Sequence, residues 1–427
     1  MSNYYIIGST NEPNNKFVVL DESDWSVEVD ESTMPNYNSE SGQFSTIVTN
    51  TKKLVFIERT SGEISGYGNI SPIYVSQGWS EITTALTPSD AEGDDTFSTS
   101  CSLSEDGNVL AVGSPTWDGG AGNDQGAVYI FDKNGTSWTE RTTALTPSDA
   151  GAIDRFGISC ALSSDGTVLA VGAYLWDGGA GNDQGAVYIF DWNGSSWTER
   201  TTALTPSDAS ANVRFGTSCS LSSDGTVLAV GAPYWDGTDD NNQGAVYVFD
   251  WNGSSWTERT TALTATDAGQ NRLFGYSCSL SSNGNILAVG SPRNTGTNGV
   301  MYIFDWSEGS WSERTNNLVP SDAGAGDFFS GSCSLSADGT VLAVGAPYWD
   351  VIDGSDEGAV YIFDWGGSSW TERSTAITPS DSGSSDYFGV SCSLAVGGTN
   401  LAAGAYGWDG DAGVDQGAVY VYDEVSV

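Results

Sequence analysis

Residues 215–259 read FGTSCSLSSDGTVLAVGAPYWDGTDDNNQGAVYVFDWNGSSWTER, and this stretch holds the signals of four short β-strands. Serines alternate with apolar residues over 218–222, and Asp224 and Gly225 then mark a turn before the apolar run 227–230. This half of the stretch predicts a hairpin.

The second half of the same stretch predicts another hairpin. The apolar run 245–249 is followed by Asn252-Gly253, a strong turn signal, and then by Trp256. Dense Gly, Ser, Thr, Asp and Asn between the runs oppose a helix. We therefore expect a four-stranded antiparallel unit.

This unit repeats along the chain. Each of the six cysteines lies four residues after a phenylalanine, and the cysteine positions are 101, 160, 219, 278, 333 and 392. Four of the five spacings are 59 residues and the other is 55. A seventh, divergent copy precedes them, with apolar runs at 44–48, 53–57, 73–75 and 79–81. Such repetition predicts an all-β, seven-bladed β-propeller of four-stranded antiparallel blades.

Three segments carry a family resemblance: Phe156-Gly157, the Val230–Pro233 stretch and the 244–249 strand. They resemble FG-GAP repeats, the blades of the integrin α-subunit propeller and of many microbial proteins. The resemblance covers residues 44–427, with repeats starting near 44, 97, 156, 215, 274, 329 and 388. It implies a propeller that serves adhesion or ligand recognition, although such propellers also occur in enzymes and structural proteins.

Calcium-binding members of this family carry an Asp-rich loop between the first two strands. Here that loop is short, as at 221–226, 104–107 and 337–339. One carboxylate cannot supply the six to eight oxygen ligands of Ca²⁺. The sequence therefore predicts no metal or cofactor. A weak calcium site in a later loop, using Asp118, Asn123 and Asp124, is the alternative.

The two ends of the chain do not form complete repeats. The last unit stops after the strand 418–422, and residues 25–29 resemble its missing fourth strand, so we expect this N-terminal strand to close the last blade. Residues 5–7 and 17–20 form an extra hairpin in this prediction. The predicted domains are an N-terminal segment, 1–43, and a propeller, 44–427; eight blades are the alternative.

Charge excludes several classes of function. The chain has 14 basic and 55 acidic residues, a net charge of −41, and no histidine. Such acidity repels nucleic acids and anionic membrane surfaces. Triads and metal sites that need histidine are also excluded. No segment is apolar enough for a membrane span, and no signal peptide is visible at the N-terminus.

The cysteines occupy one equivalent position per blade, so their Cα atoms should be too far apart for disulfides. We expect free, buried thiols.

Candidate ligand contacts lie where the repeats differ. The loops between strands two and three and between strand four and the next blade vary, and we expect both sets on one face. In five of the repeats, a Trp-Asp pair lies near the start of the strand 2–3 loop. The candidate residues are Trp117, Asp118, Trp176, Asp177, Trp235, Asp236, Trp349, Asp350, Trp408 and Asp409. The competing interpretation is structural: each tryptophan packs between blades and each aspartate caps a turn.

These features predict a non-enzymatic recognition, adhesion or structural propeller on a virion or microbial cell surface. Its partner would be a surface glycan or protein, bound through the two variable loop sets, or a component of the virion assembly. One alternative is a carbohydrate-active enzyme that uses aspartates. Another is a scaffold that assembles with itself through the N-terminal segment.

Overall fold

A computed structural model describes the chain in two parts. Within the repeats it describes residues 88–90, 95–135, 137–141, 143–237, 242–267, 269–293, 298–314, 317–322, 324, 326–350, 356–373, 376–395, 397–405, 407–408 and 418–423. Near the N-terminus it describes five strands. The chain divides into two compact units, Met1–Ser80 with Val425–Val427, and Glu81–Glu424. Among the described residues, no helix could span a membrane.

The larger unit consists of antiparallel sheets that follow one another along the chain. Five have four strands and one has three, each in sequence order. We number these sheets blades 1 to 6. Blade 1 comprises β6 (Ser100–Leu103), β7 (Val109–Ser114), β8 (Ala127–Asn134) and β9 (Ser137–Glu140). Blade 2 comprises β10 (Phe156–Leu162), β11 (Val168–Ala173), β12 (Ala186–Trp192) and β13 (Trp197–Glu199). Blade 3 comprises β14 (Ser218–Leu221), β15 (Val227–Ala232), β16 (Ala245–Trp251) and β17 (Trp256–Glu258). Blade 4 comprises β18 (Ser277–Leu280), β19 (Ile286–Ser291), β20 (Val300–Ser307) and β21 (Ser310–Glu313). Blade 5 comprises β22 (Ser332–Leu335), β23 (Val341–Ala346), β24 (Ala359–Trp365) and β25 (Trp370–Glu372). Blade 6 comprises β26 (Ser391–Leu394), β27 (Asn400–Ala405) and β28 (Ala418–Asp423).

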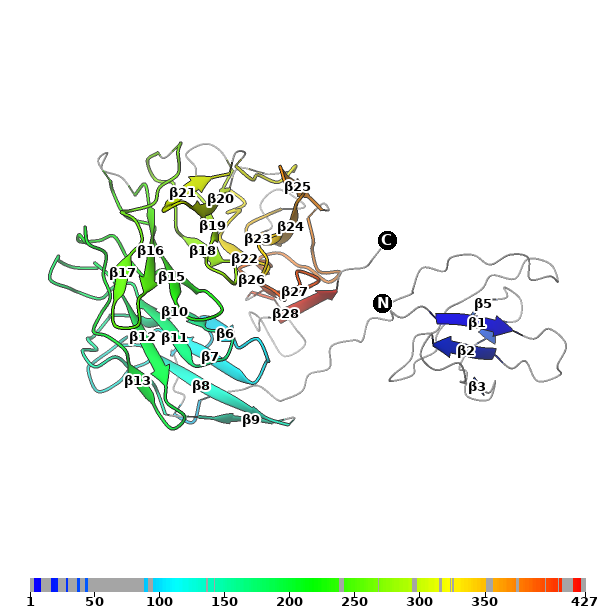
Figure 1. Ribbon diagram of the computed structural model, residues 1–427, viewed down its shortest axis with the longest axis horizontal. Helices are drawn as coiled ribbons and strands as arrows, with labels where there is room; N and C mark the ends of the chain where they lie inside the picture. Colours follow the sequence, from blue (N-terminus) through cyan, green and yellow to red (C-terminus); the bar gives the residue numbers. More distant parts are fainter. Residues whose placement is uncertain are drawn as a thin grey trace. The chain divides into compact units, whose positions relative to one another are not determined.

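The blades are arranged radially, as in a β-propeller (Figure 1). The first strand of each blade packs against the first strand of the next, from β6 to β26. The fourth strands, such as β9, β13 and β17, lie at the perimeter (Figure 1). The predicted meander of four short strands is therefore confirmed.

Glycines explain how closely the blades approach. Gly172, in the second strand of blade 2, lies against Gly216, next to the phenylalanine that opens blade 3. A Cβ atom on Gly172 would be only 2.0 Å from the carbonyl oxygen of Gly216. Gly216 itself has φ +91°, a conformation that side chains disfavour. The Phe-Gly and Gly-Ala segments of the repeat thus meet where adjacent backbones touch.

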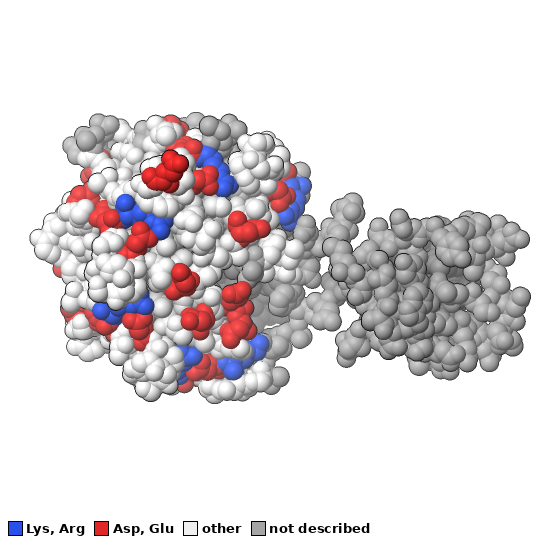
Figure 2. Space-filling view, viewed as in Figure 1, with Lys and Arg blue, Asp and Glu red and all other residues white. Residues whose placement is uncertain are grey.

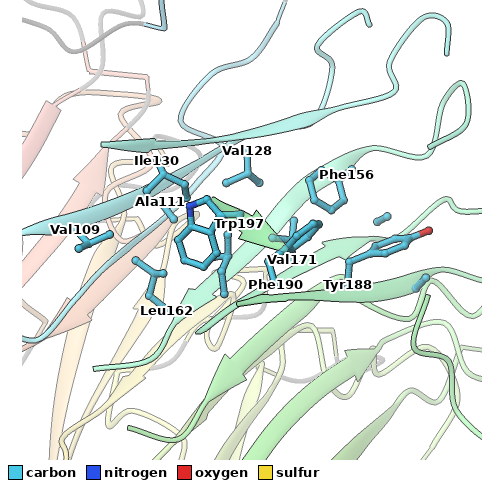
Figure 3. Close-up of a cluster of buried hydrophobic side chains, with 13 residues drawn as sticks. Val109, Ala111, Val128, Ile130, Phe156, Leu162, Val171, Tyr188, Phe190 and Trp197 are labelled. Carbon is cyan, nitrogen blue, oxygen red and sulfur yellow. The ribbon is translucent and has the colours of Figure 1, made fainter. Parts of the chain in front are cut away.

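The hydrophobic core lies between blades. Valines and alanines on one face of blade 1, such as Val109 and Val128, pack against Phe156, Tyr188 and Trp197 of blade 2 (Figure 3). Equivalent clusters join each later pair of blades. Every such cluster combines aliphatic side chains of one blade with the aromatic residues of the next, so each blade needs a neighbour on both faces.

An arginine and tryptophan contact locks each blade to the next near the perimeter. Arg200 of blade 2 forms a bidentate ion pair with Asp191. Its guanidinium also lies over the Trp251 ring of blade 3, 4.5 Å from the ring centroid. Arg141, Arg259 and Arg314 make the same pair of contacts. The tryptophans of the strand 3–4 hairpins are therefore structural.

The prediction of seven blades, with eight as the alternative, is wrong for the described residues, which form six. Phe44, taken as the start of a blade, lies in β5 (Gln43–Phe44), a two-residue strand paired with β4 (Tyr37–Asn38). The remaining predicted strands of that copy, 53–57, 73–75 and 79–81, lie outside the described residues. Glu58 also stands where the other repeats have a glycine such as Gly231. A Cβ at Gly231 would be 1.9 Å from a backbone oxygen of the next blade, so the pattern needs glycine there.

The faces at the two ends of the six-blade array are open in the part of the chain that the structure describes. Val419 of blade 6 is 71% exposed, whereas the equivalent Val187 is fully buried. Leu103 of blade 1 is 53% exposed, against 8% for Leu162. These side chains show what a blade buries when it gains a neighbour.

The expected closing strand is not where the sequence placed it. Glu28–Val29 forms β3, which pairs with β2 (Phe17–Asp21), and β2 pairs with β1 (Tyr4–Gly8). Residues 25–27 lie outside the described part. The sheet of blade 6 has three strands, ending at β28. The extra N-terminal hairpin is present, but its third strand extends that hairpin instead of blade 6.

All six cysteines are free thiols, as expected. Cys101, on the open face of blade 1, is exposed, whereas Cys278 is buried between blades. Burial raises the pKa of Cys278 to about 11 and that of Cys219 to about 12. These thiols are core residues.

Candidate functional site

The two variable loop sets adjoin each other, and together we call them the loop face. The strand 2–3 loops are 115–126, 174–185, 233–244, 292–299 and 347–358; the strand 4–1 loops are 141–155, 200–217, 259–276, 314–331 and 373–390. Backbone hydrogen bonds join one set to the other, as from Arg155 N to Asp124 O and from Arg214 N to Asp183 O. The loop face is thus a continuous, hydrogen-bonded surface.

The aspartates of the Trp-Asp pairs hold their own loops. Asp118 Oδ1 accepts a hydrogen bond from Asp124 N at 2.7 Å, and Asp177 accepts one from Asp183 N at 2.8 Å. Asp236 and Asp350 make the same contact, while Asp409 lies outside the described residues. Each of these four carboxylates therefore caps a loop, as in the structural interpretation.

The tryptophans of these pairs are half-buried. The Trp117 ring packs on Gly119, where an added Cβ would be 2.1 Å from the ring. All five pack against the cores of their blades: Trp117, Trp176, Trp235, Trp349 and Trp408. All five are also partly exposed to solvent.

Among the described residues, no three Cys, Asp or Glu side chains lie close enough together to hold a metal ion. In the loop proposed for calcium, the backbone oxygen of Asn123 accepts from Ile153 N, and Asp118 accepts from Asp124 N. The calcium alternative stays a prediction.

Buried carboxyl groups serve the fold beneath the loops. Asp154 is 5% exposed and accepts a hydrogen bond from Gly151 N at 2.7 Å. Desolvation raises its pKa, and Asp149 and Asp177 add to this effect. Asp149 accepts a hydrogen bond from the hydroxyl of Tyr188, whose pKa is raised chiefly by burial. Similar tyrosine–aspartate contacts recur in other blades.

Much of the acidity is therefore built into the repeat. One aspartate per blade meets a buried tyrosine, and another pairs with an arginine. Figure 2 shows acidic side chains spread over several blades, often beside basic ones. Each repeat adds acidic side chains at the same positions, so the net negative charge grows with the number of repeats.

A row of aromatic side chains and one arginine runs along the loop face, and we call it the aromatic belt. Its members come from blades 2 to 6: Tyr174, Arg214, Tyr234, Tyr276, Phe328, Tyr348 and Tyr387. Tyr276 and Phe328 meet edge-to-face with centroids 5.2 Å apart, and Phe328 and Tyr348 are 5.4 Å apart. Tyr348 and Tyr387 follow at 5.5 Å. The belt is continuous across blades 4 to 6.

The other end of the belt contains Arg214. Its guanidinium lies 4.4 Å from the ring centroid of Tyr234 and 5.7 Å from that of Tyr174. Burial raises the pKa of Tyr276, and Tyr234 and Tyr348, one from each half of the belt, raise it further. Tyr348 is 38% exposed. The belt offers aromatic surface to solvent across several blades.

Three belt residues, Arg214, Phe328 and Tyr387, share one position of the repeat, and its backbone is uniform from blade to blade. Arg155, Arg214, Leu273, Phe328 and Tyr387 each precede the phenylalanine that opens a blade, and each has φ between 54° and 59°. Non-glycine residues adopt this left-handed conformation at a cost of about 1 kcal/mol or more. The backbone is constant while the side chain changes from blade to blade, so the repeat presents different chemistry at one fixed place.

Reasoning from the sequence missed the belt. The Trp-Asp pairs stay a prediction as ligand contacts. Variation between repeats marks the residue before the opening phenylalanine, as in Arg214 and Phe328, and the residue before the loop tryptophan, as in Tyr234 and Tyr348. Tyr174 and Tyr276 lie at other positions of the repeat.

The comparison with protein families agrees with this fold. The chain matches the FG-GAP repeat family over 79–131, 138–190, 197–249, 311–363 and 370–422. No curated protein matches it. Similar solved structures include Kuenenia stuttgartiensis hydrazine synthase, at 16% identity and a TM-score of 0.46, covering 77% of this chain and 78% of that one. Another is a putative TolB from Agrobacterium tumefaciens, at 14% identity and a TM-score of 0.41, covering 78% and 91%.

Four of the five matched segments begin in a fourth strand and end in the third strand of the next blade, so each of these four spans one blade-to-blade contact. The five segments together cover more than half of the chain, and their Phe-Gly and Gly-Ala residues are those that bring adjacent backbones together. The chain belongs to the FG-GAP repeat family.

Proposed function

We propose that the protein is a non-enzymatic recognition propeller that binds its ligand through the loop face. The observation that carries this proposal is the aromatic belt. Tyr348 is exposed and the other belt tyrosines are partly exposed, and rigid aromatic side chains are typical anchors of binding sites. The residues that maintain the fold are nearly invariant between blades, whereas the belt positions differ.

The ligand of this proposal is a surface glycan or a protein, and the place of action is a virion or microbial cell surface. Support for recognition in place of catalysis comes from the Trp-Asp carboxylates, which accept hydrogen bonds from their own loops. These contacts give each carboxylate a role in the conformation of its own loop.

A binding screen with matched variants tests the proposal. Wild-type protein is screened against an array of saccharides and against candidate surface proteins. Every hit is then retested with the double variant Tyr348→Ala/Tyr387→Ala. The control is Ser254→Ala in the β16–β17 hairpin, which lies at the opposite ends of the strands.

The belt variant should lose binding by about tenfold or more, as expected for anchor residues, while the hairpin variant keeps it. Binding that survives the belt variant but is lost with the hairpin variant would place the ligand on the other face and end this proposal.

A further inference from the structure

Four arginines lie on the loop face, and they fall into two kinds. Arg155 pairs with Asp124 at 3.2 Å, and Arg272 pairs with Asp267 at 2.9 Å. Arg214 and Arg293 have no carboxylate within ion-pair distance among the described residues. The net charge of the chain is −41, so an arginine without an acidic partner is unusual here.

Arg214 is held in place without using its hydrogen-bond donors. Its guanidinium stacks on Tyr234 and also contacts Tyr174, so its orientation is set by the two rings. Stacking uses the face of the guanidinium and leaves its N–H groups, which lie in the plane, free to bind an acceptor. The side chain is half-buried, and none of its nitrogens is both buried and unsatisfied.

Arg293 stands nearby on blade 4. It is exposed, and it occupies the repeat position of Tyr234 and Tyr348. Its charge lowers the pKa of Tyr276, although burial and the neighbouring tyrosines raise that pKa by more. Tyr276 therefore lies within electrostatic reach of Arg293, Tyr234 and Tyr174. Arg214 thus lies against two tyrosines, and Arg293 stands on the next blade at the repeat position of one of them, Tyr234.

We infer that this part of the belt binds the carboxylate of an acidic saccharide. Arg214 and Arg293 would receive the carboxylate, and Tyr234 and Tyr276 would contact the sugar ring. This inference rests on the proposed function and adds the class of ligand.

The chemistry of the groups favours this ligand. A planar guanidinium with free in-plane donors binds carboxylates through charge-assisted hydrogen bonds. Tyrosine rings next to such a charge supply apolar contact and a hydroxyl, which suits a sugar ring with one apolar face. The acidic surroundings repel long polyanions such as nucleic acids, whereas a single carboxylate can meet the free donors of a guanidinium.

The chain contains a matched control. Arg155 occupies the same repeat position as Arg214, with the same backbone conformation (φ 59° and 54°), but Asp124 neutralises it. Binding of trigalacturonate and of 3′-sialyllactose is measured by calorimetry on full-length wild type, Arg214→Gln, Arg293→Gln and Arg155→Gln. The neutral counterparts are methyl-esterified trigalacturonate and lactose, and circular dichroism confirms that each variant is folded.

The inference predicts that at least one acidic probe binds more tightly than its neutral counterpart. Arg214→Gln and Arg293→Gln should each weaken that binding by about tenfold or more, the effect of losing a hydrogen bond to a charged group. Arg155→Gln should bind as wild type does. Whichever acidic probe binds identifies the source of the carboxylate, uronic or sialic acid.

Three results would overturn the inference. Equal affinity for acidic and neutral probes, unchanged in Arg214→Gln, removes the carboxylate site but leaves recognition by the loop face intact. Binding of a polyglutamate peptide without any saccharide assigns the arginines to a different ligand class. No binding of any probe, in a protein whose screen hits depend on Tyr348 and Tyr387, excludes acidic saccharides while the proposed function stands.

Discussion

Replacing Gly172 by alanine tests whether the family glycines serve the contact between blades. A Cβ atom at this position would lie 2.0 Å from the carbonyl oxygen of Gly216, whereas ordinary contacts begin at 3.4 Å. The two backbones must therefore separate by about 1.4 Å, and neither can rotate away as a side chain could. Overpacking costs about 1–3 kcal/mol, and the rigid obstacle here places the expected loss at about 3 kcal/mol.

Equilibrium unfolding in urea measures this loss, followed by both tryptophan fluorescence and far-UV circular dichroism, since agreement of the two probes supports a two-state analysis. The control is Gly120→Ala in a strand 2–3 loop, where an added Cβ meets nothing within 4 Å. Its free energy of unfolding should change by about 0.5 kcal/mol or less. If Gly172→Ala is as mild as Gly120→Ala, the steric explanation of the glycines is refuted.

Three further predictions concern the buried charges and thiols. The pKa of Asp154 is raised in the folded state, so the contribution of this carboxyl to stability falls as the pH rises above 3.8, the ordinary pKa of an aspartate. The melting temperature of Asp154→Asn should therefore exceed that of wild type by more at pH 7 than at pH 4. An equal difference at both pH values would contradict this. Arg259 is 7% exposed and lies 4.6 Å from the centroid of the Trp306 ring, so Arg259→Met should lower the free energy of unfolding by about 2 kcal/mol. A double-mutant cycle with Trp306→Leu should give a coupling energy of about 1 kcal/mol, and additive effects of the two substitutions would exclude the stacking contribution. Cys219 and Cys278 should react with a thiol reagent at pH 8 only after unfolding, and fast labelling of the native protein would show that the blades do not cover them.

The strands were predictable because each is a short apolar run next to a strong turn signal. The run at 227–230 and the turn at Asn252-Gly253 lie where the sequence placed them, in β15 and between β16 and β17. Local chemistry determines these elements, so comparing repeats was enough to find them.

The number of blades was not predictable in the same way. Phe44 has the spacing of a repeat, yet it lies in a two-residue strand paired with β4, and the runs after it lie outside the described residues. A blade also needs glycine where the next backbone approaches, and Glu58 stands at that position. The prediction of the closing strand was also wrong, because residues 28–29 pair with Phe17 and Val18, which lie nearer in the sequence than blade 6.

The two loop sets could be identified from the sequence, whereas the contacts among their side chains could not. The sequence indicated the two loop sets, and they do adjoin. It could not indicate that Arg214 would stack on Tyr234, or that Phe328 would meet Tyr276, because these contacts join side chains from different repeat positions. Such a surface exists only after the blades are assembled.

Chemical footprinting of the tyrosines tests the central claim most directly. Hydroxyl radicals modify exposed rings, and mass spectrometry quantifies the modification of each tyrosine with and without the ligand found in the screen. Recognition by the belt predicts protection of Tyr234, Tyr276 and Tyr348 in the complex, with no change at the perimeter residues Trp192 and Trp251. Protection of the perimeter tryptophans, with the belt tyrosines modified as in the free protein, would contradict the account.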